Sequence, residues 1–255
     1  MMISVKTPEE IKKMKKGGKI LAEVVHKILE NAKPGISELE LERLADSLIY
    51  KKSGFPGFKK VNGYNFATCI STNDVIVHGV PGKYKLKEGD VFGIDCGVYL
   101  DGFFTDMSET IRIRSSKFKP RNDNIDKFLE TGKHALDEAI KQAKAGNRVG
   151  NISKTIQDII EKNDYSVVKE LIGHGVGKKL HEYPEVPGFL TGKIEKTPLL
   201  REGMTIAIEV IYNMGKKEIK YTKDGWTIKT KDGKVSGLFE RTVLVTKKEP
   251  VILTS

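Results

Sequence analysis

Four carboxylates of this sequence, Asp95, Asp106, Glu209 and Glu240, stand within β-rich runs of largely apolar or small residues. Acidic side chains are seldom buried without a partner, because an isolated charge is costly away from water. Two divalent cations would balance the four negative charges. Oxygen ligands joined by an imidazole suit Mn, Fe, Co or Zn, and the sequence does not choose among these metals. We therefore predict a metal site with oxygen-rich ligands.

The register of one predicted hairpin brings two of these carboxylates together. Asp101-Gly102 is a favoured two-residue turn between apolar runs. This turn pairs Gly97 with Asp106, and Asp95, two residues from Gly97, points to the same face. The two carboxylates become diagonal neighbours, roughly 7–8 Å apart at the backbone. Such a pair repels unless a cation neutralises it.

Histidines supply the candidate nitrogen ligands. His174 lies in the glycine-rich run 173–177, where the backbone can turn tightly and a ligand can approach closely. That run fits neither the P-loop nor the dinucleotide-binding spacing, and the segment from His181 lacks the second histidine of the HExxH zinc helix. His78, before a predicted turn, is compatible with a turn residue or an active-site residue. The sequence has no Gly-x-Ser-x-Gly nucleophile elbow, which disfavours a serine hydrolase.

The elements that must position these residues alternate between helices and strands. Capping-box patterns at Thr7 and Ser37 each predict the start of a helix. Short β-rich runs separated by turn signals follow over 67–114. Two further helices are expected at about 125–144 and 152–162, and a second β-rich region fills the rest of the chain.

An internal repeat relates the two β-rich regions. Segment 86–95, which ends on Asp95, can be laid over segment 200–209, which ends on Glu209, at a constant offset of 114 residues. The pattern is also a common way to begin a strand, but the matched carboxylates favour a duplication. We predict one domain spanning residues 1–255, built from two related halves of about 1–120 and 121–255. Facing halves would bring Asp95 and Glu209 to the centre.

The composition is ordinary for a soluble globular protein, with 38% apolar and 31% charged residues. The net charge of +10 is spread along the chain. It predicts a solvated lysine-rich surface and at most transient proximity to a polyanion such as the ribosome, without specific nucleic-acid recognition. We expect no membrane association, because no apolar run approaches the roughly 20 residues of a membrane helix. Cys69 and Cys96 give no disulfide framework, and we expect the cytoplasm.

Taken together, the set of two Asp, one His and two Glu residues resembles that of the type I methionine aminopeptidases, in the pita-bread metallopeptidase superfamily. The resemblance covers nearly the whole chain, and five ligands in the family's order and spacing are far more specific than any single motif. It implies an α+β fold, a pseudo-two-fold antiparallel β-sheet flanked by two pairs of helices, and we expect a monomer. Beyond the ligands, the resemblance is carried by residues 69–74, 78–81, 173–177, 181–182, 224–227 and 240–242.

The resemblance also implies two divalent metal ions. One is expected to be held by Asp95, Asp106 and Glu240, and the other by Asp106, His174, Glu209 and Glu240. A hydroxide bridging the ions, formed because the metals lower the pKa of bound water, would attack the first peptide carbonyl. The implied enzyme is a methionyl aminopeptidase that removes the initiator methionine from the N-terminus of nascent proteins and peptides.

Roles for individual side chains follow from the same resemblance. Glu209 would act as general base and then as general acid. His78 would contact the scissile amide and assist the leaving nitrogen, and His181 would bind the substrate carbonyl and support the oxyanion. A sulfur-lined and aromatic-lined pocket suits a thioether. Besides the two histidines, the expected methionine pocket includes Tyr64, Cys69, Leu180 and Trp226.

Three positions depart from the family pattern. Arg241 follows Glu240 where His is usual, Val210 follows Glu209 where Pro is usual, and Asn62 stands near a position where some members have a pocket His. A permanent cation beside a metal ligand would reshape the hydrogen bonds around that ligand. Because no ligand is lost, we predict an active enzyme with an altered rate or substrate preference.

Two other functions remain open. One is a proline-specific aminopeptidase of the same fold, which the short chain and the lack of an extra N-terminal domain disfavour. The other is a non-catalytic binding protein that kept the fold, which the intact ligand set disfavours. Cleavage of Met-Gly-x against x-Pro peptides discriminates among the three.

Overall fold

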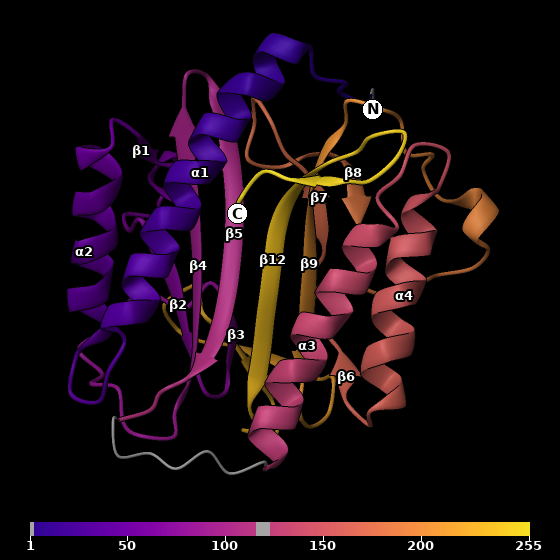
Figure 1. The fold of residues 1–255 in the computed structure, drawn as a ribbon. Helices are drawn as coiled ribbons and strands as arrows, with labels where there is room; N and C mark the ends of the chain where they lie inside the picture. The colour runs from indigo at the N-terminus through magenta and orange to yellow at the C-terminus, as the bar shows by residue number, and fades with distance from the viewer. Residues whose placement is uncertain (1–2, 116–122) are drawn as a thin grey trace.

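The computed structural model describes residues 3–115 and 123–255, and four α-helices lie within them (Figure 1). The capping patterns are used as predicted: Thr7 caps the first helix and Ser37 the second, each with a capping box completed by a glutamate three residues on. The helices are α1 (Pro8–Asn31), α2 (Glu38–Lys51), α3 (Asn124–Lys141) and α4 (Val149–Lys162).

The second pair of helices differs from its expected bounds. Helix α3 ends three residues before the expected position, and Lys144 already forms an isolated bridge with Thr246. Helix α4 begins three residues before its expected start. Its N-cap is Arg148, whose backbone N–H donates to the side-chain oxygen of Asn151 at 2.8 Å. Arginine is not a usual N-cap residue, so the sequence carries no clear start signal there.

The described strands form one large antiparallel sheet of ten strands and one small sheet of three. The large sheet has the order β1-β4-β5-β12-β9-β7-β8, with β2 paired to β4, β6 to β9 and β13 to β12; the small sheet has the order β10-β11-β3. The strands are β1 (Phe55–Pro56), β2 (Thr68–Thr72), β3 (Val75–Val77), β4 (Val91–Leu100), β5 (Phe103–Arg112), β6 (Ser166–Val167), β7 (Gly173–Gly175), β8 (Glu182–Val186), β9 (Thr205–Asn213), β10 (Ile219–Tyr221), β11 (Ile228–Thr230), β12 (Ser236–Leu244) and β13 (Val251–Ile252); two 3₁₀ turns, η1 (Gly57–Lys60) and η2 (Ile194–Lys196), complete the described elements.

The predicted hairpin joins β4 and β5. Its two turn residues have left-handed backbones, Asp101 with φ 50° and Gly102 with φ 91°, as a type I′ turn requires. The resulting register pairs Gly97 with Asp106, as predicted from the turn. It also pairs Asp95 with Ser108, so Asp95 and Asp106 lie on the same face of the sheet.

Two pairs of helices pack on the large sheet. In Figure 1, α1 and α2 lie over the half that contains β4 and β5, and α3 and α4 over the half that contains β9 and β12. The α+β architecture with an antiparallel sheet flanked by two helix pairs is therefore confirmed. Among the described residues, no helix has the length and apolar character needed to cross a membrane.

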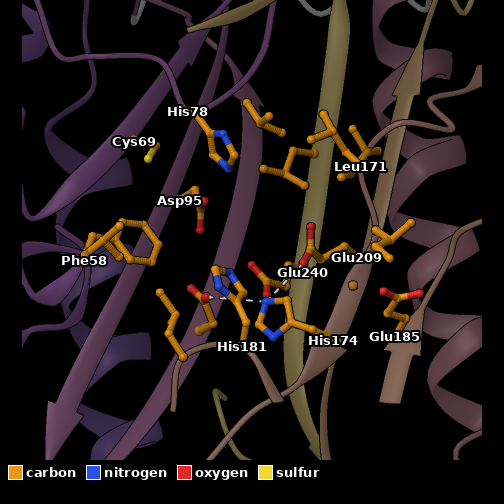
Figure 2. Close-up of a pocket in the computed structure, with 18 of the residues that line it drawn as sticks. Phe58, Cys69, His78, Asp95, Leu171, His174, His181, Glu185, Glu209 and Glu240 are labelled. Carbon is orange, nitrogen blue, oxygen red and sulfur yellow. Dashed lines mark ion pairs between the residues drawn. The ribbon is translucent and has the colours of Figure 1, made fainter. Parts of the chain in front are cut away.

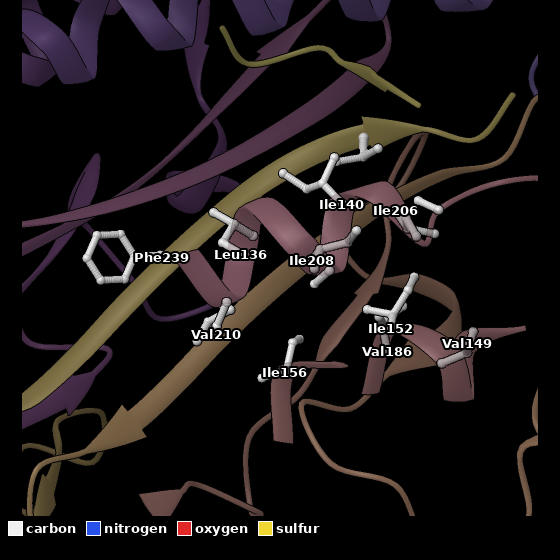
Figure 3. Close-up of a cluster of buried hydrophobic side chains, with 14 of the residues drawn as sticks. Leu136, Ile140, Val149, Ile152, Ile156, Val186, Ile206, Ile208, Val210 and Phe239 are labelled. Carbon is white, nitrogen blue, oxygen red and sulfur yellow. The ribbon is translucent and has the colours of Figure 1, made fainter. Parts of the chain in front are cut away.

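Alternation along the central strands separates a core from a polar face. On β9, Ile206, Ile208 and Val210 pack toward Leu136 of α3 in a fully buried core (Figure 3). Glu209 lies between them and points to the other face, because successive side chains of a strand alternate. Burying each such aliphatic side chain contributes roughly 1.5–3 kcal/mol. The helix-facing residues thus stabilise the strand, and the residues between them can bind a ligand or take part in catalysis on the other face.

The internal repeat has a counterpart in the backbone. Gly89, before β4, and Gly203, before β9, both have left-handed backbones, with φ of 91° and 85°. Each precedes a strand that follows a pair of helices. Two related halves remain a proposal, and the expected boundary between them, near residue 120, lies outside the described residues.

Candidate metal centre

A cavity of about 550 Å³ opens on the sheet face that carries the carboxylates (Figure 2). Its walls come from segments far apart in the sequence, including the loop around His78, the segment 180–183 and the central strands. The structure brings all the site residues expected from the sequence to this cavity: Tyr64, Cys69, His78, Asp95, Asp106, His174, Leu180, His181, Glu209, Trp226 and Glu240.

Each of the five expected metal ligands stands on a strand. Asp95, Asp106, Glu240 and Glu209 lie on β4, β5, β12 and β9, which are consecutive neighbours in the sheet. His174 lies on β7, beside β9, and pairs with Ala207 across the two strands. The close strand contact depends on the preceding glycine, because a Cβ at position 173 would lie 2.5 Å from a backbone oxygen.

The ligand atoms converge. One oxygen each from Asp106 and Glu240 and one ring nitrogen of His174 all lie within 4.8 Å of one another. His174 Nε2 is 3.4 Å from Glu209 Oε1 and 4.0 Å from Asp106 Oδ2 (Figure 2). Asp95 joins the group through Ser108, whose hydroxyl oxygen is 2.9 Å from Asp95 Oδ1 and 2.9 Å from Glu240 Oε2.

The tautomer of His174 is set by the backbone. Its Nδ1 lies 2.9 Å from the carbonyl oxygen of Gly175, which can only accept a hydrogen bond, so Nδ1 carries the proton. The lone pair of Nε2 then points at the carboxylates of Glu209 and Asp106. Burial, with a smaller contribution from the charge of His181, lowers the pKa of His174 to about 4. A neutral imidazole with its lone pair toward carboxylates is the arrangement of a metal-ligating histidine.

The carboxylates are crowded and shielded from water. Burial raises the pKa of Asp95 to about 7, against hydrogen bonds from Ser108 and the backbone that lower it. Burial also raises the pKa of Asp106, Glu209 and Glu240 well above the ordinary range, and the charges of neighbouring carboxylates raise these values further. Like charges brought together in this way require a positive partner to remain ionised.

These side chains fit a divalent cation. Among the described residues, Glu240 Oε1 is buried without a hydrogen-bond partner, although buried polar atoms are almost always satisfied. His174 offers an unprotonated nitrogen beside it. A divalent cation would bind the lone pairs of Glu240 Oε1 and His174 Nε2 and would neutralise the carboxylates. The donor atoms of this site therefore suit a divalent metal ion.

Two further histidines face the same space. His181 packs edge-on against the His174 ring, with centroids 4.4 Å apart. Burial lowers the pKa of His181 and of His78, and the charge of His181 adds to the effect on His78. Both shifts favour the neutral form of the ring, which can donate one N–H. The His78 backbone has φ of 54°, a strained conformation often found at functional sites.

Part of the cavity wall is aromatic and sulfur-bearing. Tyr64 and Trp226 contact each other edge to face, with ring centroids 5.0 Å apart. The Tyr64 hydroxyl donates to the Thr68 carbonyl at 2.8 Å, which fixes the ring. Burial raises the pKa of the Cys69 thiol well above its usual value, so this sulfur is uncharged and apolar.

Sequence reasoning missed several residues of this region. Ser108 bridges two carboxylates, and the register deduced from the turn already placed it opposite Asp95. Phe58 and Leu171 also line the cavity, but no local pattern marks them, because aliphatic and aromatic residues occur throughout the core. Ile211 and Leu238 lie beside the ligands Glu209 and Glu240 on the same cavity face.

The three departures from the family pattern lie away from the ligand atoms. Arg241 forms an ion pair with Glu109 and donates from Nη1 to the carbonyl oxygens of Ser108 and Glu240 at 2.9 and 2.7 Å. Val210 is fully buried in the core against α3 and α4. Asn62 is exposed and does not line the cavity.

Fold, site and the comparisons that follow together indicate a metal-dependent hydrolase whose central antiparallel sheet carries the candidate metal ligands. The profile of metallopeptidase family M24 matches residues 12–247. The chain is 41% identical over 253 residues to methionine aminopeptidase from Clostridium perfringens, covering 99% of each chain. It is 42% identical over 261 residues to that of Aquifex aeolicus, covering 100% of this chain and 99% of the relative. The chain therefore belongs to metallopeptidase family M24.

Solved structures agree with this assignment. Methionine aminopeptidase from Thermotoga maritima matches with a TM-score of 0.94 at 36% identity, over 100% of both chains. Prolidase from Pyrococcus furiosus matches with a TM-score of 0.74 at 23% identity, over 98% of this chain and 65% of that one. The second likeness shows the pita-bread fold alone. The first extends over the complete length of both proteins.

Proposed function

We propose that this protein is a metal-dependent aminopeptidase that removes the N-terminal methionine from nascent proteins and peptides. The observation that carries the proposal is the convergence of five potential metal ligands beside a wall formed by Tyr64, Cys69 and Trp226. The full-length relatives named methionine aminopeptidase support the same function. An apolar thioether side chain fits an uncharged wall of sulfur and aromatic rings.

We propose a dinuclear site. Two divalent ions match the four carboxylate charges, with Asp95, Asp106 and Glu240 holding one and Asp106, His174, Glu209 and Glu240 the other; Mn, Fe, Co and Zn all suit this donor set. When bound, the ions supply a Lewis acid for the substrate carbonyl and lower the pKa of a coordinated water.

The chain's own groups then divide the remaining work. Glu209 takes a proton from the attacking water and later delivers a proton to the departing amine nitrogen. His181, neutral and partly exposed to the cavity, donates an N–H to the oxygen of the scissile carbonyl as negative charge develops there. His78 contacts the scissile amide from the opposite loop. Leu180, beside His181, completes the apolar contact with the methionine side chain.

The setting of the enzyme is part of the proposal. Both cysteines of the chain, Cys69 and Cys96, are buried and free, which supports a reducing cytoplasm. We propose a monomer whose single catalytic domain consists of two related halves. We further propose that the enzyme encounters its substrates as they leave the ribosome, where its net charge of +10 favours transient attraction to a polyanion.

Cleavage of short peptides tests the function. The metal-free protein is loaded with Mn, Fe, Co or Zn and offered Met-Gly-x and x-Pro peptides, and the released amino acid is quantified. Methionine release with at least one metal is expected, and Glu209→Gln should lose roughly 10²- to 10⁴-fold in kcat while still folding. Release of x ahead of Pro would instead indicate a proline-specific peptidase. Metal binding with no turnover of either peptide would indicate a non-catalytic binding protein.

A further inference from the structure

A single exposed carboxylate organises the turn between β10 and β11. Asp224 Oδ1 accepts hydrogen bonds from the Thr222 hydroxyl at 2.8 Å and from the backbone N–H groups of Trp226 and Thr227 at 2.9 and 2.8 Å. Its Oδ2 accepts from the Thr227 hydroxyl at 2.6 Å. Gly225 has φ of 80°, which closes the turn around this carboxylate. Four donors therefore converge on one side chain.

The four hydrogen-bond donors stabilise the ionised form of Asp224. Slight burial raises its pKa, but the hydrogen bonds from Thr227, Trp226 and Thr222 outweigh that effect and hold the pKa at about 2. The carboxylate is thus ionised throughout the neutral pH range. An ionised carboxylate accepts from all four donors, which a neutral side chain of the same shape cannot do.

The Thr227 hydroxyl links the Asp224 turn to the loop that contains His78 and Val80. A hydroxyl has one hydrogen, and here it is donated to Asp224 Oδ2. The oxygen of Thr227 therefore presents a lone pair to the backbone N–H of Val80, which donates to it at 3.2 Å. Val80 is two residues from His78, whose left-handed backbone needs support from its surroundings.

The same turn also fixes a wall of the cavity. Trp226 packs on Tyr64 at a centroid distance of 5.0 Å, and a Cβ at Gly63 would lie 3.6 Å from the indole ring. The Trp226 backbone N–H is one of the donors held by Asp224. One carboxylate outside the cavity lining thus supports both the aromatic wall and the segment that carries His78.

We propose that Asp224 is a positioning residue that couples the side-chain pocket of the substrate to the His78 loop, through Trp226 on one side and through Thr227 and Val80 on the other. The proposal rests on the proposed function for its kinetic consequences. The structural part of the proposal, that Asp224 fixes the orientation of the turn, is independent of that function, because the orientation can be measured without any substrate. No contact between Asp224 and substrate is involved.

Asp224→Asn is the sharpest variant because it is isosteric. Its amide oxygen can still accept at the position of Oδ1, but its NH₂ group replaces the acceptor Oδ2. The Thr227 hydroxyl oxygen must then accept a hydrogen bond from this NH₂ group. Its own hydrogen turns toward the backbone N–H of Val80, so two donors face each other. The hydrogen bond from Val80 to Thr227 is therefore broken by the exchange of one carboxylate oxygen for an NH₂ group.

A matched control lies in the neighbouring turn. Asp232 is also exposed and also holds a turn by accepting backbone N–H groups, those of Lys216 at 2.8 Å and Lys234 at 3.0 Å. It is not among the residues that line the cavity, and its hydrogen bonds hold a different turn. Asp232→Asn therefore reproduces the loss of a turn-stabilising carboxylate without disturbing the proposed coupling.

The first measurement is fluorescence, because Trp226 is the only tryptophan of the sequence. In the metal-free, substrate-free protein, Asp224→Asn should shift the emission maximum to the red and increase quenching by acrylamide, whereas Asp232→Asn should match wild type. Circular dichroism checks that both variants are folded. An Asp224→Asn spectrum identical to that of Asp232→Asn would overturn the proposal, whether or not the wild type cleaves methionine peptides.

The second measurement is the kinetic split in the metal-loaded enzyme. Asp224→Asn should raise KM through the pocket wall and lower kcat through His78, with kcat/KM falling about 10- to 100-fold, as expected for small displacements of catalytic groups. Thr227→Val should lower mainly kcat, and Thr227→Ser, which keeps the hydroxyl, should restore it. Equal loss in Thr227→Ser and Thr227→Val, or a fall in kcat/KM equal to that of Asp232→Asn, would contradict the coupling.

Discussion

The carboxylates of Asp95 and Glu240 meet at one hydroxyl, with Ser108 Oγ 2.9 Å from an oxygen of each. Because that hydroxyl has a single hydrogen, it can donate to only one of the two carboxylates at a time. The other carboxylate must be neutralised in another way, and the metal ion that we propose both side chains share would do so. Ser108 therefore aligns two proposed ligands that belong to different strands.

Ser108→Ala should weaken metal binding by about 10- to 100-fold, the range observed when groups that orient metal ligands are removed. Isothermal titration of the metal-free protein measures the effect. Ser71→Ala is the matched control, because Ser71 is a buried strand serine whose hydroxyl has no partner among the described residues. Equal affinities for the two variants would contradict a role for Ser108 in ligand alignment.

Asp106→Asn should reduce metal content at least about 10-fold, because Asp106 shares the centre with His174 and Glu240. Elemental analysis after dialysis measures the bound metal. Asp101→Asn serves as control, since Asp101 occupies the hairpin turn with φ of 50°, a conformation that asparagine tolerates. Full metal occupancy in Asp106→Asn would show that this carboxylate is not a shared ligand.

Metal removal should make the stability of the protein fall as pH rises through the neutral range. In the metal-free protein the carboxylates have raised pKa values, with that of Asp95 at about 7, so the folded state binds more protons than the unfolded state. Stability must then fall as pH rises, by at least about 1 kcal/mol between pH 6.5 and 8. His174 opposes this trend only slightly, by about 0.4 kcal/mol, because its pKa is about 4 in the folded protein and about 6.5 in the unfolded chain, where its titration overlaps the lower end of the window.

Chemical unfolding with and without metal measures this dependence. Saturating metal should flatten the curve, because bound cations keep the carboxylates ionised throughout the range, and should add roughly 2.7 kcal/mol at 100 times the dissociation constant. A metal-free protein that becomes more stable between pH 6.5 and 8 would contradict the raised pKa values.

Arg241 should prove to be a structural residue. Its ion pair with Glu109 leaves side-chain exposures of only 18% and 13%, so Arg241→Met should destabilise by roughly 3 kcal/mol, the lower end of the range for a buried pair. The double variant Arg241→Met/Glu109→Met should recover most of this loss. Lys247→Met, which breaks an exposed pair, should stay within about 0.5 kcal/mol of wild type. Urea unfolding measures all three.

The same variants test the alternative role of Arg241. If its charge acted on the metal ligands directly, the double variant would recover stability but not kcat. We expect kcat of the double variant to lie near wild type, because the guanidinium contacts Glu109 and backbone carbonyls and does not line the cavity.

The parts of the site that could be deduced from the sequence are those fixed by local geometry. A two-residue Asp-Gly turn permits one register, and that register places Asp95 and Asp106 on one face. His174 could not be located in this way, because β7 has only three residues and is held by long-range pairing with β9. The small sheet that joins β3 to β10 and β11 was equally beyond local patterns.

The proposed coupling through Asp224 is an example of what could not be predicted from the sequence. The run Asp224 to Thr227 marks a turn in the sequence, but the contact between Thr227 and Val80 joins residues 147 positions apart. Only the folded backbone brings such partners together. Contacts of this kind depend on tertiary packing, and turn and strand propensities carry no information about them.

The alternation of β9 between core and cavity has a consequence for how this enzyme can vary. Inserting or deleting one residue within the strand would move Glu209 into the helix interface and Ile208 into the cavity, so catalysis and folding would fail together. Substitutions that preserve the spacing face no such penalty. Ile211 and Leu238 can be exchanged to alter what the cavity accepts while Ile208 and Val210 hold the strand in place. Substrate range and stability are thus separately adjustable, provided the length of the strand is kept.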